Sequence, residues 1–93
     1  MISIIDNDIR RGTKKIGWYE ENRIYNHEGK KLGYFLDNRI YNTDGDKIAY
    51  LQNDYVYAED GSRKLRVEDV CEDVSGGTLS NVGRAAIRLF LGD

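Results

Sequence analysis

Short apolar runs alternate with pairs of Asp, Asn or Glu along most of the chain, and this pattern predicts a series of β-hairpins. Between residues 16 and 63, β-branched and aromatic residues recur on both sides of the pairs Glu21-Asn22, Asp37-Asn38 and Asn53-Asp54. Alternation with a period of two is typical of strands. A two-residue loop of this kind is typical of a hairpin turn in which both central residues have positive φ. Asp6-Asn7 predicts a fourth hairpin at the start of the chain.

The hairpins are copies of one unit. Three copies align without gaps, at residues 16–31, 32–47 and 48–63. Tyr25, Tyr41 and Tyr57 occupy the same position in each copy, so the period is 16 residues. A fixed period of this kind is the mark of a repeat architecture. The spacing from Asp6-Asn7 to the next turn is 15 residues, which predicts a shortened connection near Arg11-Gly12.

Counting outward from the turns assigns the side chains of each hairpin to two faces, because side chains alternate along a strand. One face carries the apolar pairs Ile4 with Ile9, Tyr19 with Ile24, Phe35 with Ile40, and Leu51 with Val56. The other carries Trp18 with Tyr25, Tyr34 with Tyr41, and Tyr50 with Tyr57, but Ser3 with Arg10 in the first hairpin. A shared core has to be apolar in every copy, so we predict that the first face is buried. The aromatic face then lies outside or packs between hairpins.

Small residues next to the core pairs, at Gly17, Gly33 and Ala49, allow close backbone approach. We therefore predict an all-β fold for residues 1–74, with four antiparallel β-hairpins built from ~16-residue repeats around a pseudo-four-fold axis. Closure around an axis is favoured over a flat sheet because it removes exposed strand edges. The weak alternation from Lys64 to Val70 predicts a ninth strand that closes or caps the assembly.

The C-terminal segment, residues 75–93, has a different composition. After a hinge at Ser75-Gly76-Gly77, the spacing of apolar residues predicts a short amphipathic helix from Val82 to Leu91, capped by Ser80 or Asn81 and ended by Gly92. A helix this apolar has to be covered. Two alternatives stay open: the helix packs on its own β domain, or it docks a partner or second copy. In the second case, the candidate interface residues are Val82, Ala86, Leu89 and Phe90.

The repeated pattern [IL]-[GA]-[WY]-[YFL]-x-[EDN]-[ND]-x-[IV]-Y-x-x-x-G resembles the bacterial four-fold β-flower domain. The resemblance covers about residues 2 to 70 in three clear copies and one degenerate copy. It implies a small module of four hairpins about a pseudo-four-fold axis, and it assigns no catalytic or ligand-binding residue. The chain is more loosely similar to the aromatic hairpin repeats of bacterial surface proteins that bind choline or cell-wall glycan. Those repeats pair tryptophans, whereas this chain has only Trp18.

The candidate binding residues are those of the aromatic face: Trp18, Tyr25, Tyr34, Tyr41, Tyr50 and Tyr57. A row of such rings can stack on sugars or bases, or anchor a partner protein. Cross-strand aromatic pairs also stabilise a sheet without any ligand, which is the alternative explanation. Lysines recur at repeat spacing and can line one rim with positive charge. The formal net charge of −2 and the nearby carboxylates argue against nucleic acid as a partner.

No pattern of catalytic or metal-ligating residues emerges. His27 lies alone in a connection, and the thiolate of Cys71 is disfavoured by the acidic residues around it. We expect no cofactor, no metal, no membrane association and a cytoplasmic location. The expected function is a non-enzymatic protein-interaction or scaffold module, with self-association as one form of interaction. The alternative is a ligand-binding module whose aromatic face recognises a glycan or another flat ligand.

Overall fold

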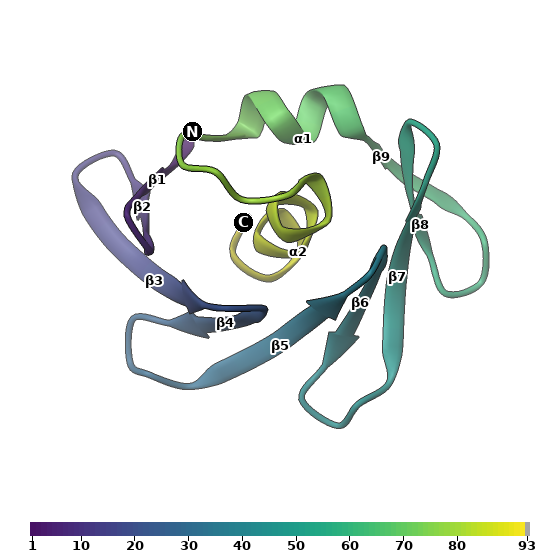
Figure 1. Ribbon diagram of the computed structural model, residues 1–93, viewed down its shortest axis with the longest axis horizontal. Helices are drawn as coiled ribbons and strands as arrows, with labels where there is room; N and C mark the ends of the chain where they lie inside the picture. The colour runs from purple at the N-terminus through teal and green to yellow at the C-terminus, as the bar shows by residue number, and fades with distance from the viewer. Residues whose placement is uncertain (93) are drawn as a thin grey trace.

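The computed structural model describes residues 1–92 and contains one 10-stranded sheet and two helices. The elements are β1 (Ile2–Ile5), β2 (Asp8–Arg11), β3 (Lys14–Glu20), β4 (Arg23–Asn26), β5 (Lys31–Leu36), β6 (Arg39–Asn42), β7 (Lys47–Gln52), β8 (Tyr55–Ala58), β9 (Arg63–Arg66), α1 (Val67–Asp73), β10 (Val74–Ser75) and α2 (Asn81–Leu91). Strands β1 to β9 lie side by side in chain order, and β10 pairs in parallel with β1. The sheet curves around α2, which lies in its interior (Figure 1).

The predicted cross-strand partners are those in the structure. Ile4 pairs with Ile9, Tyr19 with Ile24, Phe35 with Ile40, and Leu51 with Val56. Ile9, Ile24, Ile40 and Val56 are 0% exposed, whereas Tyr19, Phe35 and Leu51 are partly buried against the same core. The predicted inner face is therefore confirmed in all four pairs.

The turns differ from the prediction in one respect. Only the first residue of each pair has positive φ, between 54° and 57°, at Asp6, Glu21, Asp37 and Asn53. Positive φ at the first central position alone is typical of a type II′ turn, not of the predicted turn with two such residues. The carbonyl of the second residue is used by the next copy: Asn22 O, for example, accepts from Phe35 N at 3.0 Å. The turns thus connect consecutive hairpins.

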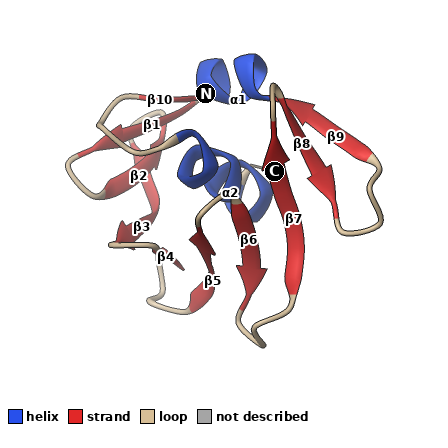
Figure 2. Ribbon diagram, turned by 45° about the vertical axis from the view of Figure 1, so that its right-hand side comes forward, coloured by secondary structure: helices blue, strands red, loops and turns tan. Residues whose placement is uncertain are grey.

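The segment from Lys64 to Val70 was only partly predicted. Arg63–Arg66 form the expected ninth strand, but the prediction of strand from Val67 to Val70 was wrong, because α1 begins at Val67. Val70 is 1% exposed and points into the core from the helix. Glu68 and Asp69 lie in its first turn, where carboxylates interact favourably with the helix dipole. Helix α1 spans the gap between the two ends of the sheet (Figure 2).

Helix α2 forms as predicted and fills the interior of the sheet. The side chain of Ser80 caps it by accepting from Gly83 N at 3.2 Å. Ala85, Ala86 and Ile87 are 0% exposed, and Val82 is 5% exposed. Phe90 lies against Gly33, where a Cβ atom would collide with its ring. The predicted small positions of the inner face therefore make room for the helix.

The glycine-containing connection before α2 is fixed by contacts with Arg84. The Arg84 guanidinium donates to the carbonyls of Val74 at 2.9 Å, Leu79 at 3.1 Å and Gly77 at 3.2 Å. A Cβ atom on Gly76 would lie 2.6 Å from Ile4 O. This segment, which the sequence predicts to be a hinge, is thus packed against β1 in the structure.

Candidate binding surface on the outer side of the sheet

The outer aromatic face consists of the six rings named above, on strands β3 to β8. Their rings stack in cross-strand pairs: Trp18 on Tyr25 at 5.5 Å between centroids, Tyr34 on Tyr41 at 5.0 Å, and Tyr50 on Tyr57 at 5.3 Å. The ring planes in each pair lie within 19° of parallel. Each ring is half-buried and faces away from α2, because its sequence neighbours face the core. The structure thus brings the six predicted residues onto one face, in three pairs.

A lysine lies over the first ring of each pair. The Nζ atom of Lys15 is 5.1 Å from the Trp18 ring centroid, that of Lys31 is 5.2 Å from Tyr34, and that of Lys47 is 5.1 Å from Tyr50. Contacts of this kind contribute about 0.5–1 kcal/mol each at exposed sites. Arg63 and Tyr55 make a similar contact at 4.1 Å in the last copy. The outer face is therefore a regular array of rings and cations.

A β-bulge in each connecting pair of strands produces this array. Between β4 and β5, the register shifts so that Ile24 opposes Gly33 while Tyr25 opposes Lys31. Leu32 is the extra residue, and it packs against the core. The bulge turns Lys31 to the face that carries Tyr34, although strict alternation over three positions would separate them. Strict alternation hides these contacts, although a basic residue three positions before the first ring of each pair is a signal in the sequence.

Carboxylates neutralise most cations on this face, but not all. Lys15 pairs with Asp8 at 3.0 Å in the first copy, and Arg66 pairs with Glu68 at 2.7 Å in the last. The side chain of Arg23 contacts Glu20 at 3.3 Å and Glu21 at 3.0 Å. The negative charge of ionised Tyr25 is the largest cause that raises the pKa of Arg23 above its ordinary value, and the charges of Glu21 and Glu20 raise it further. Arg23 is thus paired with two carboxylates. Arg39, at the same position of the next hairpin, makes no ion pair within residues 1–92.

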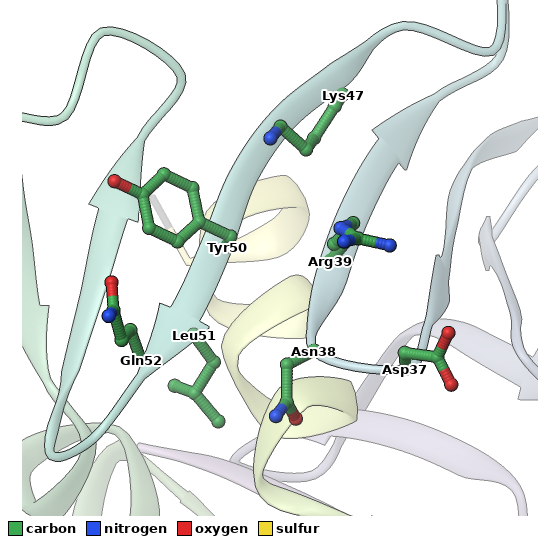
Figure 3. Close-up of a pocket in the computed structure, with 7 residues that line it drawn as sticks. All are labelled: Asp37, Asn38, Arg39, Lys47, Tyr50, Leu51 and Gln52. Carbon is green, nitrogen blue, oxygen red and sulfur yellow. The ribbon is translucent and has the colours of Figure 1, made fainter.

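A cavity of about 390 Å³ opens between β6 and β7. It is lined by Asp37, Asn38, Arg39, Lys47, Tyr50, Leu51 and Gln52. Figure 3 shows Arg39 and Tyr50 on adjoining strands, with Lys47 farther along β7. Arg39 and Tyr50 are direct cross-strand partners. Lys47 lies 3.6 Å from Glu59, whereas Arg39 makes no hydrogen bond or ion pair within residues 1–92.

The other predicted site residues belong to the fold in this structure. Val82 and Ala86 are buried inside the chain, and Leu89 and Phe90 pack against its core. Of the two alternatives for the helix, the structure shows packing on its own domain. A role of these four residues in binding a partner stays a prediction that would require the helix to leave the sheet.

The residues outside this face offer little further chemistry. His27 is exposed in a turn, and the Sγ atom of exposed Cys71 lies 3.4 Å from Asn81 Oδ1. Across residues 1–92, no three His, Cys, Asp or Glu side chains are grouped so that they could hold a metal ion. Neither α1 nor α2 has the length and apolar character needed to cross a bilayer. The outer aromatic face and its cavity remain the main candidate site.

Comparison with protein families agrees with the fold and repeats. Residues 22–69 match the family described as 4-fold beta flower protein. The chain belongs to this 4-fold beta flower family. The matched region runs from the turn of the second hairpin to the first turn of α1, and it includes five of the six stacked rings. No curated protein and no solved structure matches the chain.

Proposed function

We propose that this member of the 4-fold beta flower family is a non-enzymatic protein-interaction or scaffold module that binds through its outer aromatic face. One observation carries the proposal: α2 is enclosed by the sheet, so the aromatic and cationic array is the large patterned surface left facing outward. Tyr, Trp and Arg are the residues that most often anchor protein interfaces. The rings and cations of this face are held in fixed pairs, so a partner would order few side chains on binding.

A pseudo-four-fold arrangement of the hairpins is part of the proposal. Four hairpins with equivalent cross-strand pairs support it, as do the recurring turns with positive φ at their first residue. The repetition would present similar grooves at regular intervals around the molecule. Such a surface suits a scaffold that contacts one partner at several points, or several copies of a short segment.

A flat ligand such as a glycan is the second candidate, because a cavity of about 390 Å³ lies beside Tyr50. Ligand pockets commonly have volumes of about 300–1,000 Å³. The rings are stacked on each other and carry lysines, so much of their π surface is already used inside the protein. A ligand would therefore meet ring edges, hydroxyl groups and ammonium groups more than open ring faces.

We also propose a cytoplasmic location. The single cysteine, Cys71, is free and exposed in the structure. Exposed unpaired thiols are better suited to reducing compartments than to oxidising ones. Self-association stays within the proposal, and the outer aromatic face is the surface that a second copy would use.

The test compares protein capture by two charge-matched variants. Lys31→Glu/Lys47→Glu removes two ammonium groups from the rings, whereas Lys14→Glu/Lys30→Glu makes the same charge change at exposed neighbouring positions. Tagged wild type and variants are mixed with lysate of the source cells, and captured proteins are quantified by mass spectrometry. The proposal predicts partners that wild type and Lys14→Glu/Lys30→Glu retain equally and that Lys31→Glu/Lys47→Glu loses. Equal capture by all three proteins would refute it.

A further inference from the structure

The cavity between β6 and β7 is lined by Arg39, which makes no ion pair within residues 1–92, unlike the equivalent arginine of the previous copy. The repeat allows a direct comparison with the previous copy, in which Arg23 occupies the position of Arg39. The strand partner of Arg23 is Glu20, but the strand partner of Arg39 is Leu36. The carboxylate that neutralises Arg23 from across the hairpin is therefore replaced by an exposed apolar side chain.

The second carboxylate is lost for a different reason. Glu21 reaches Arg23 at 3.0 Å from the first position of its turn. Asp37 holds the equivalent position with nearly the same φ, but its side chain is one methylene shorter, and it makes no ion pair with Arg39. Arg39 is thus an exposed guanidinium that lines a cavity without the carboxylates that its counterpart has.

We infer that the Arg39 cavity binds a carboxylate from an acidic peptide segment of a partner protein, with Arg39 as its main contact. This inference rests on the proposed function and names the chemistry of the partner. In the previous copy, the corresponding arginine, Arg23, donates hydrogen bonds to two adjacent glutamates, Glu20 and Glu21. A partner segment with adjacent acidic residues would supply in trans what that hairpin supplies in cis.

The geometry of the cavity suits such a group. A guanidinium forms paired hydrogen bonds with a carboxylate, and these charge-assisted bonds are stronger than neutral ones. Lys47 adds a second positive charge at the cavity wall, shared with Glu59 at 3.6 Å. Tyr50 provides a rigid ring beside Arg39 as its cross-strand partner. Asp37 also lines the cavity, and its negative charge limits the affinity for a free anion that makes no further contacts.

The test follows the resonances of ¹⁵N-labelled full-length protein during titration with a short acetylated and amidated Gly-Glu-Glu-Gly peptide. The Gly-Gln-Gln-Gly peptide is the control for charge, and inorganic phosphate is a separate arm. We expect saturable shifts at the Arg39 side-chain Nε–H group and around the cavity with the acidic peptide and none with the Gly-Gln-Gln-Gly control. Phosphate should bind at least ~10-fold more weakly, because the peptide also contacts the neighbouring surface.

Three variants sharpen the test. Arg39→Gln should weaken peptide binding by about 10-fold or more, in line with the energy of hydrogen bonds to charged groups. Arg23→Gln makes the same change where two carboxylates already pair with the arginine, and it should leave binding within about twofold, because Arg23 does not line the cavity and its charge is already offset by Glu20 and Glu21. Leu36→Glu/Asp37→Glu restores both carboxylates to Arg39 and should weaken binding as much as Arg39→Gln. The equivalent turn already accepts glutamate at positive φ, so this variant should fold.

Several outcomes would overturn the inference. Unchanged peptide binding by Arg39→Gln would do so, and so would shifts spread over all cationic side chains in proportion to their exposure. Phosphate binding as tight as peptide binding would make the cavity a general anion site and overturn the assignment to a peptide. If the capture experiment still depends on Lys31 and Lys47 while Arg39 stays silent, the proposed function stands and only this inference fails.

Discussion

Gly33→Ala tests whether α2 is packed against the inner face of the sheet as closely as the structure shows. A Cβ atom at this position would lie 2.9 Å from Cε2 of Phe90, and it would come closer still to Phe90 Cζ and to the carbonyl oxygen of Tyr41. Ordinary contacts to a Cβ atom are 3.4–4 Å. The Phe90 ring and the backbone at Tyr41 therefore both have to shift, in a core where such overpacking costs about 1–3 kcal/mol.

The net effect is smaller than the steric cost. Alanine is favoured over glycine within regular structure by about 0.5–1 kcal/mol, which offsets part of the strain. We expect a loss of about 1–2 kcal/mol in the free energy of unfolding. For a domain of this size, each kcal/mol lowers Tm by about 4–8 °C. Urea denaturation followed by circular dichroism measures the loss, and calorimetry measures the shift in Tm.

A double-mutant comparison identifies the cause. In a Phe90→Leu background, the two ring atoms that crowd the new methyl group are absent while the Tyr41 carbonyl oxygen remains, so Gly33→Ala should cost about 1 kcal/mol less than in wild type. Ala49→Gly is the control at the equivalent position of β7, and it should cost about 1–2 kcal/mol, because it adds the glycine penalty to the loss of a buried methyl group. The packing argument fails if Gly33→Ala is neutral, or if its cost is the same in the wild-type and Phe90→Leu backgrounds.

The remaining predictions concern the helix cap and one turn. Ser80→Ala removes the hydroxyl that accepts from Gly83 N, and chemical denaturation should show a loss of about 1 kcal/mol; no loss would mean that the cap is not formed in solution. The amide and hydroxyl of Ser62 lower the pKa of Asp60, so carboxyl NMR should find Asp60 titrating below an ordinary aspartate. Because this pKa is depressed, the associated stability is present above the unfolded-state pKa and lost as pH falls through the folded-state pKa. An ordinary pKa for Asp60 would contradict the turn geometry.

The register of the hairpins could be predicted from the sequence because a two-residue turn sets which residues lie opposite each other. The period of two then sets which face each side chain occupies. A slip of one residue would move Ile24 and Ile40 to the outside, so the inner face excludes other registers. The turn type could not be predicted from composition alone, because Asp and Asn tolerate positive φ at either central position.

The bulges and α1 could not be predicted by counting alternation. An extra residue such as Leu32 breaks the period of two, and Lys31 then changes face. Val67 and Val70 are three positions apart, which suits a helix. However, the seven residues of α1 are too few for the spacing of apolar residues to distinguish a helix from a continuation of β9. The apolar stripe of α2 showed that the helix had to be covered, not what covers it. The structure shows that the sheet covers the helix, for example where the Phe90 ring lies against Gly33, and such a contact between residues far apart in the sequence cannot be found from periodicity.

The most direct test of the account is whether the sheet folds without α2. A chain ending at Val74 is compared with the full chain by circular dichroism and by light scattering after size-exclusion chromatography. Since Ala85, Ala86 and Ile87 are 0% exposed inside the sheet, we predict that the truncated chain loses cooperative unfolding and that a peptide of residues 78–93 restores it. A truncated chain that is a folded monomer would contradict this prediction, and the helix would then be an assembly element only if the full chain is oligomeric.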